Sequence, residues 1–412
     1  MKYFTVLLLI LTEAASAQVT PPILSSWILN TTGKTGYGGL PSNVQRVQYS
    51  DSNIYVSCSC IPGYDIGPWP GNPNTPTNQN FVFRITRSPI PNTGAKTPTP
   101  LGHIGVWSNG VSIFNAKDAN SYNNGGIWNQ NAIIVEGSSF DECLGHPAPN
   151  GEYHHHLNPV CLYNAKDSTH HSPIIGYAFD GYPIYGAYDY SQTDGSGGAR
   201  RMQSSYRLRN ISDRTTLPGG TALSTNQYGP AISSQYPLGY YIEDFEYIAS
   251  SGDLDENNGR FCVTPEYPTG TYAYFVTIDA NGNAAYPYTL GPAYYGVVTT
   301  GNTGPGSGHV TISEPVLTYI PSADGVSGTS RDSSTFTIYP NPASNYVVID
   351  YSSTKDFITH IDLIDERGTY VLTQNTTGPT MLLTLTSLPH GNYFASIVTS
   401  SGAKYVKRVV RE

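Results

Sequence analysis

Short apolar segments separated by Asn, Gly, Pro and Asp recur along most of the chain, a pattern typical of strands joined by tight turns. The clearest is residues 105–114, where apolar residues flank an Asn-Gly pair that is typical of a type I′ hairpin turn. Two further hairpins are predicted over 174–185 and 272–290, and a pair of strands over 42–60. No segment has the periodicity of a long helix, so strands dominate the prediction.

The same pattern divides the chain into a large and a small part. Residues 42–296 predict one large β-rich region, in which 133–135 are expected to form a buried strand and 187–236 an irregular polar insertion. Glycine and serine at 299–308 predict a flexible linker. The last ~80 residues predict a small β-sandwich. We therefore predict an all-β fold, a large irregular antiparallel β domain followed by a small C-terminal β-sandwich.

The N-terminus predicts export. Lys2 precedes an apolar run that ends at Leu11, and Ala15-Ser16-Ala17 is a small-residue cleavage site, as in a secretory signal peptide. The run is shorter than the ~20 residues that span a bilayer, and no later segment is long enough, so no membrane span is predicted. The predicted boundaries are 1–17 for the signal peptide, 18–298 for the large domain, 299–334 for the linker and 335–412 for the small domain.

Export permits disulfide bonds, and the chain has five cysteines. We predict a bridge between Cys143 and Cys161, which bracket a histidine triplet. Cys262 could then pair with either Cys58 or Cys60. Because the count is odd, at least one thiol is left over, as a buried small apolar group or as a soft metal ligand.

Charge is sparse, at 12 % of 412 residues, and the net charge of −9 is scattered. A nucleic-acid partner would require a basic patch, which the sequence lacks, so none is predicted. The sequence also has no Gly-x-Ser-x-Gly elbow, no phosphate-binding glycine loop and no His-Glu-x-x-His helix. A serine or thiol hydrolase is therefore poorly supported.

Candidate chemistry concentrates in a short stretch that holds six of the ten histidines, residues 146–171. Alternating strand side chains would place His154 and His156 on one face, close enough to bind one metal ion if other ligands converge. His146 and His171 could fold back toward this pair. We predict that these four histidines bind a transition metal ion, because imidazole suits zinc, copper, nickel and iron better than calcium or magnesium. Zinc and copper are the expected ions.

Other residues near the triplet have less specific roles. His155 would lie on the opposite face, where a structural or supporting role is expected, and His170 is either exposed or an accessory ligand. Asp141 and Glu152 could complete the coordination from either side of the triplet.

Two acidic residues farther along the chain are candidate catalytic groups. Asp180 precedes a glycine in a turn, so it either bonds the local backbone or acts as a ligand or an orienting partner of an imidazole. Glu243 lies in an aromatic segment expected to be a strand, where a charge is unusual unless it faces a site or water.

The large domain resembles the YHYH-domain proteins. Their Tyr-His-Tyr-His motif stands here as Tyr153-His154-His155-His156, with His155 in place of the second tyrosine. Segments similar to the family also include 171–185, 241–247 and 258–268, so the resemblance covers roughly the whole first domain. It implies a family but supplies no reaction.

The small domain resembles the C-terminal sorting domain of the type IX secretion system. Residues 339–345, 361–368 and 388–393 and the Lys- and Arg-containing C-terminal tail carry this resemblance. It implies a Bacteroidetes-type cell, passage across the outer membrane and removal of the domain on arrival. The expected partner is therefore the type IX secretion machinery, and the expected location is secreted or on the cell surface, outside the outer membrane.

Three functional hypotheses follow. The first is a metal-dependent enzyme, hydrolytic with zinc or redox-active with copper or iron, acting on an extracellular glycan or small molecule. The second is a non-catalytic cell-surface protein that binds metal or glycan, and the third is a disulfide-stiffened scaffold whose histidines bind nothing. Three protein ligands and an open position would favour the enzyme, and a closed four-ligand sphere would favour a structural or carrier site.

Overall fold

The computed structural model describes residues 20–321, 336–351, 357–365, 369–400 and 404–412. Contacts divide the chain into two compact units, Pro21–Tyr319 and the part that follows it, Ile320–Glu412. The predicted signal peptide and residues 322–334 of the predicted linker lie outside the described residues. No helix in the described part of the chain is long and apolar enough to cross a membrane.

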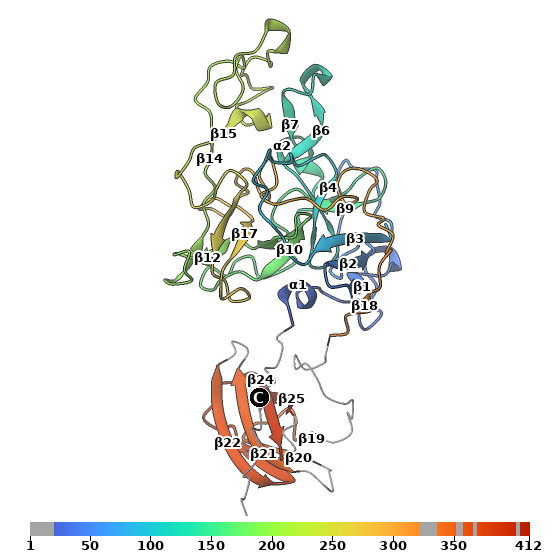
Figure 1. Ribbon diagram of the computed structural model, residues 1–412, viewed down its shortest axis with the longest axis vertical. Helices are drawn as coiled ribbons and strands as arrows, with labels where there is room; N and C mark the ends of the chain where they lie inside the picture. Colours follow the sequence, from blue (N-terminus) through green and yellow to red (C-terminus); the bar gives the residue numbers. More distant parts are fainter. Residues whose placement is uncertain (1–19, 322–335, 352–356, 366–368, 401–403) are drawn as a thin grey trace, which may run out of the picture. The chain divides into compact units, whose positions relative to one another are not determined.

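An eight-stranded sheet forms the centre of the first unit (Figure 1). Its order is β16 (Gly259–Cys262), β17 (Thr271–Phe275), β11 (Pro183–Tyr185), β10 (Ile174–Ala178), β4 (His103–Trp107), β5 (Ser112–Phe114), β9 (Tyr153–His155) and β8 (His146–Pro147). Neighbouring strands are antiparallel except for two parallel pairs, β11 with β17 and β5 with β9. The predicted hairpins at β4–β5 and β10–β11 are confirmed.

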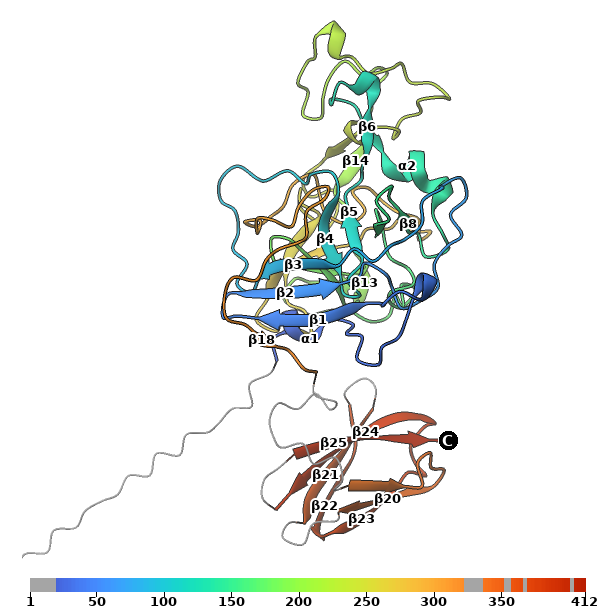
Figure 2. The ribbon, with the colours of Figure 1, turned by 90° about the vertical axis from the view of Figure 1, so that its right-hand side faces the viewer.

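A four-stranded sheet packs on one face of this central sheet. It has the order β18 (Leu317–Thr318), β1 (Val44–Tyr49), β2 (Asn53–Cys58) and β3 (Phe81–Thr86). Val56 and Phe83 of the smaller sheet share one buried cluster with Tyr177 and Phe275 of the central sheet. The strands of the two sheets cross at a large angle (Figure 2). A second cluster, around Trp107, covers the other face, so the central strands are buried on both sides.

The remaining elements of the first unit are short. Three two-stranded ribbons are β6 (Lys117–Ser121) with β7 (Asn129–Asn131), β12 (Tyr188–Tyr190) with β13 (Ala199–Arg201), and β14 (Tyr206–Leu208) with β15 (Phe245–Tyr247). The helical turns are α1 (Pro22–Ser25), α2 (Ala132–Glu136), η1 (Tyr37–Gly39), η2 (Tyr122–Asn124), η3 (Gly137–Ser139), η4 (Thr225–Gln227) and η5 (Ile242–Asp244). The predicted polar insertion 187–236 thus contains three short strands.

Three local predictions are wrong. Residues 133–135 are helical and lie in α2, where the Asn131 side chain caps the helix by accepting a hydrogen bond from Ile133 N. Ile134 is 53 % exposed, so the segment is not a buried strand. The turn in 105–114 is not type I′, since Gly110 has a positive φ of 82° but Asn109 does not. In the hairpin predicted over 272–290, which is fully described, the first strand is present as β17 but the second is not. A single bridge joins Ile278 and Ala284.

The stretch predicted as a flexible linker packs on the first unit as far as Tyr319. Val82 N donates to Gly308 O, Val310 N donates to Val82 O, and β18 extends the smaller sheet beside β1. The glycines at 301, 304, 306 and 308 all have positive φ. They form ordered turns, which composition alone does not distinguish from a flexible chain.

The second unit is a β-sandwich, as predicted. One sheet has the order β19 (Phe336–Tyr339), β20 (Tyr346–Tyr351), β23 (Thr380–Thr384), and the other β22 (Tyr370–Gly378), β21 (Ile358–Asp365), β24 (Gly391–Thr399), β25 (Lys404–Arg411). Alternate residues of both sheets, among them Val347, Leu363 and Ile397, form one buried cluster. The all-β prediction is confirmed in both units.

Candidate metal centre

Three of the four predicted ligands meet at one edge of the central sheet. His146 on β8 pairs directly with His154 on β9, and His156 follows two residues later on the same face. The three side chains are buried, with 3–4 % of each residue exposed. One ring nitrogen from each lies within 4.8 Å of those of the other two, and His154 Nε2 lies 3.1 Å from His156 Nε2.

A hydrogen bond at Nδ1 places a proton on that nitrogen in each ring. His154 Nδ1 lies 3.1 Å from Glu152 O and His156 Nδ1 lies 2.6 Å from Asn115 O. Carbonyl oxygens only accept, so each Nδ1 carries the proton. His146 Nδ1 lies 2.8 Å from Ser139 Oγ, whose own proton is donated to Glu136 O, so this Nδ1 also donates.

Neutral rings with a proton on Nδ1 have a lone pair on Nε2, and these lone pairs converge. Burial and the neighbouring imidazoles lower the pKa of His146 to about 3 and lower the pKa of His154 well below its usual value, so both rings are neutral at physiological pH. The Nε2 atoms of His154 and His156 lie 3.1 Å apart, so they need a proton or a metal ion between them to offset the repulsion of their lone pairs. The three side chains therefore fit a transition metal ion, and their Nδ1 hydrogen bonds are the outer contacts that orient histidine ligands.

A disulfide and an aspartate shape the loop that carries His146. Cys143 and Cys161 are bonded, as predicted. Asp141 Oδ1 accepts from Cys143 N and Gly145 N, and Oδ2 accepts from Tyr153 Oη at 2.9 Å. Asp141 therefore organises the loop and is not among the converging donors.

The predicted second bridge is wrong. Cys58, Cys60 and Cys262 are all free and buried, and burial raises the pKa of the Cys58 and Cys262 thiols to about 12. Their thiols therefore remain protonated and pack as small apolar groups.

The fourth predicted ligand, His171, lies elsewhere. Its Nε2 is 2.8 Å from Asp189 Oδ1 and its Nδ1 is 2.6 Å from Ser172 O. Asp189 also contacts the Arg260 guanidinium. The structure thus places His171 in a buried ion-pair network apart from the other three histidines.

The remaining residues of the stretch surround the centre without joining it. His155 is fully buried on the opposite face, with its ring edge-on to Tyr153. His170 is 65 % exposed and contacts Asp167. Glu152 Oε1 lies 2.8 Å from His103 Nδ1, so its carboxylate is engaged while its backbone oxygen holds His154.

The two predicted catalytic candidates have structural partners. Asp180 accepts from Tyr274 Oη at 2.6 Å and from Gly296 N at 2.8 Å, and burial raises its pKa to about 6. Glu243 lies in η5, not in a strand, and accepts from the backbone and side-chain nitrogens of Asn129. Burial raises its pKa to about 7. Neither is among the residues that line the pocket at the histidines.

That pocket has a volume of about 910 Å³, and His146, His154 and His156 all line it. Its ionisable residues besides the histidines are Asp118, Glu136 and Glu152, and its lining contains no lysine or arginine among the described residues. Sequence reasoning missed Glu136, whose Oε2 lies 3.0 Å from His156 Nε2. The assignment of 133–135 to a strand concealed it, whereas Asn131 as a helix cap was the available signal.

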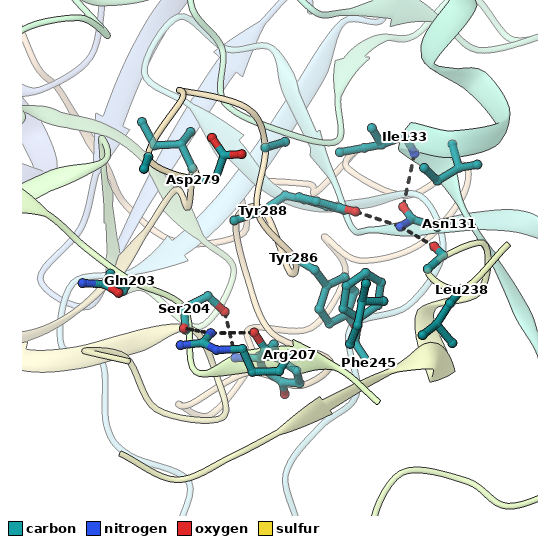
Figure 3. A pocket seen from close by; sticks show the side chains of 18 of the residues that line it. Asn131, Ile133, Gln203, Ser204, Arg207, Leu238, Phe245, Asp279, Tyr286 and Tyr288 are labelled. Carbon is teal, nitrogen blue, oxygen red and sulfur yellow. Dashed lines mark hydrogen bonds between the residues drawn. The ribbon is translucent and has the colours of Figure 1, made fainter. Parts of the chain in front are cut away.

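A second pocket of about 580 Å³ is lined in part by Ile133 and Ile134 of α2 (Figure 3). Phe245 and Tyr286 stack there with ring centroids 4.3 Å apart, and Arg207 bonds to backbone oxygens, including Ser204 O. Its lining contains no histidine or cysteine among the described residues. The histidine-lined pocket is therefore the candidate functional site.

Comparison with known proteins identifies both units. Residues 82–286 match the family model described as YHYH protein, and this range contains the three converging histidines. Residues 337–412 match the model described as secretion system C-terminal sorting domain. No curated protein matches the chain.

Proposed function

We propose that the chain is a metal-dependent enzyme whose ion is bound by His146, His154 and His156. The chain carries a YHYH domain and a C-terminal sorting domain for type IX secretion, and the sorting domain makes it a secreted or cell-surface protein. The observation that carries the proposal is the convergence of three Nε2 lone pairs, held by Nδ1 hydrogen bonds, at the wall of a pocket of about 910 Å³.

The ligand set supports zinc, copper or iron over calcium and magnesium, because neutral imidazole suits the former group. Bound zinc would lower the pKa of a water molecule for hydrolysis, whereas copper or iron would supply redox chemistry. The protein residues hold the imidazoles in one tautomer and one orientation. Glu152 O, Asn115 O and Ser139 Oγ supply the contacts that do so.

The pocket lining supports an uncharged or cationic substrate. Its polar lining includes Asn72, Asn74 and Asn150, and no lysine or arginine of the described chain lines it to pair with a phosphate or sulfate. An extracellular glycan without acidic groups, or a neutral small molecule, fits this lining. Charged phosphate esters do not.

The proposal is tested by elemental analysis of the exported chain, expressed in a periplasm and purified without a nickel column. We expect about one equivalent of a transition metal in the wild type and almost none in the His154→Ala/His156→Ala variant. His170→Ala is the matched control, because His170 belongs to the same stretch but is 65 % exposed. A wild-type protein that stays empty after dialysis against zinc, copper and iron would contradict the proposal.

A non-catalytic metal-binding protein is the second candidate. The Glu136 carboxylate, 3.0 Å from His156 Nε2, favours it because a fourth protein donor closes a tetrahedral sphere. Binding of azide to the metal-loaded protein, seen as a new absorption band with copper or cobalt, would indicate an open position and favour the enzyme. No band with either ion would favour the carrier.

A further inference from the structure

Glu136 presents a carboxylate oxygen to two of the three histidines, His146 and His156. It ends α2, and its side chain is 30 % exposed at the pocket. Its Oε2 lies 3.0 Å from His156 Nε2 and 3.6 Å from His146 Nε2. This oxygen is shielded from solvent and has no hydrogen-bond donor among the described residues. His156 Nδ1 donates to Asn115 O, so the Nε2 of this ring is the atom that faces the carboxylate, and a cation between the two would contact both.

The surrounding contacts hold Glu136 in this position from both ends of the helix. At the N-terminal end, Asn131 accepts from Ile133 N and donates to Tyr288 Oη at 2.8 Å (Figure 3). At the C-terminal end, Ser139 Oγ donates to Glu136 O and accepts from His146 Nδ1. The carboxylate-bearing turn and one histidine are thus connected through a single hydroxyl group.

We propose that Glu136 is a fourth ligand of the ion, so that the site has three imidazoles and one carboxylate. Bonds of ~2.0–2.1 Å at tetrahedral angles place neighbouring donor atoms roughly 3.3–3.4 Å apart. The observed separations of 3.1 Å between His154 and His156, and of 3.0 and 3.6 Å from Glu136 to His156 and His146, lie around this value. Glu136 does not belong to the group of donors within 4.8 Å of one another, so its carboxylate must move toward His154 when the ion binds. Glu136 also supplies the negative charge that a buried dication requires beside three neutral rings.

This ligand set narrows the metal. A carboxylate is a hard donor, so its presence beside imidazoles favours a divalent ion such as zinc, iron or manganese over cuprous copper. A strictly tetrahedral ion would be closed by these four donors, as in the second candidate function. An ion that accepts five or six ligands keeps open positions toward the pocket, which the proposed enzyme requires. The inference rests on the proposed metal site and adds a residue that the histidine cluster does not contain.

The experiment compares metal affinity in the full exported chain for the wild type, Glu136→Gln and Glu142→Gln. Glu142 is exposed six residues away and makes a matched control for the loss of one negative charge. Affinities are measured for zinc by competition with a chromophoric chelator. Loss of an outer contact costs 10–100-fold in affinity, so loss of a direct ligand should weaken binding by at least ~10-fold in Glu136→Gln and leave Glu142→Gln unchanged.

Cobalt(II) substitution provides a second readout, because exchanging the carboxylate for an amide changes the ligand field. We expect the visible bands of Glu136→Gln to shift and those of Glu142→Gln to match the wild type. Equal zinc affinity and identical cobalt spectra in Glu136→Gln would overturn the role of Glu136 while leaving the three-histidine site intact. Absence of binding to the wild type would instead refute the proposed function.

Discussion

Replacing His154 and His156 by alanine should abolish the dependence of thermal stability on metal. Both side chains are buried and supply two of the three converging Nε2 atoms. A ligand that binds only the folded state stabilises it by about 2.7 kcal/mol when its free concentration is 100 times Kd. One kcal/mol raises the Tm of a large domain by about 2 °C, so saturating metal should raise the wild-type Tm by about 5 °C.

Without metal, the His154→Ala/His156→Ala variant will also be less stable than the wild type, for a reason that does not involve metal. Glu152 O and Asn115 O lose the donors at 3.1 and 2.6 Å, and an unpaired buried acceptor costs about 1–3 kcal/mol. The informative quantity is therefore the difference in Tm between metal-loaded and chelator-treated samples of the same protein. An absolute loss of stability alone does not distinguish a metal site from a set of structural histidines.

The assay is thermal unfolding followed by circular dichroism, with added zinc, copper or iron and with excess chelator. The wild type and His170→Ala should both show the metal-dependent increase in Tm, because His170 is 65 % exposed. The double variant should show no change within error. The reasoning is refuted if the double variant keeps the wild-type increase, or if the wild type shows none with any of the three metals.

Three further predictions follow from the structure. The Cys143–Cys161 bond closes a loop of 18 residues, so Cys143→Ser/Cys161→Ser should lose about 3 kcal/mol of stability in denaturant unfolding. This variant should also bind metal more weakly, because the loop carries His146, and unchanged stability would contradict the prediction. Burial raises the pKa of Asp180 from 3.8 to about 6, so the neutral form is favoured in the fold: its stabilising effect is complete below pH 4 and is lost as the pH rises through 6. Asp180→Asn should remove a fall of about 3 kcal/mol between pH 4 and 7, measured by urea unfolding at each pH, and a wild-type profile without this fall would exclude the effect. Asn131→Ala should lower the free energy of unfolding by about 1 kcal/mol through loss of the α2 cap. It should also lower zinc affinity in the chelator competition if α2 positions Glu136, and equal affinity would show that the helix keeps its position without the cap.

The sequence predicts strands well where alternation and a turn signal agree. The β1–β2 and β10–β11 pairs lie within the predicted ranges, and the sandwich of the second unit follows its apolar pattern. Residues 133–135 show the limit of this reasoning, since an apolar run of three fits a buried strand and a helix turn equally. The Asn131 cap, seen in the fold, decides for the helix.

The site is predictable only in its local part. His154 and His156 are two residues apart, so strand geometry alone places them on one face. His146 joins them because β8 pairs with β9, a contact that the disulfide made plausible. His171 belongs to the same stretch of sequence, but the strand that follows it enters the sheet elsewhere and its ring pairs with Asp189. Histidines that are close in sequence therefore share a site only when the strands that carry them are neighbours in the sheet.

The contacts that orient the histidines reach a segment that composition assigns to a linker. Glu152 holds His154 through its backbone oxygen, and its carboxylate bonds His103 Nδ1 at 2.8 Å. His103 Nε2 in turn lies 3.0 Å from Ser307 Oγ, and the neighbouring Pro305 and Gly306 line the pocket. The residues after 298 thus complete the wall of the pocket and support His154 through the buried residues His103 and Glu152. An exported form shortened before this segment would lack part of the site, so the functional domain extends to Tyr319.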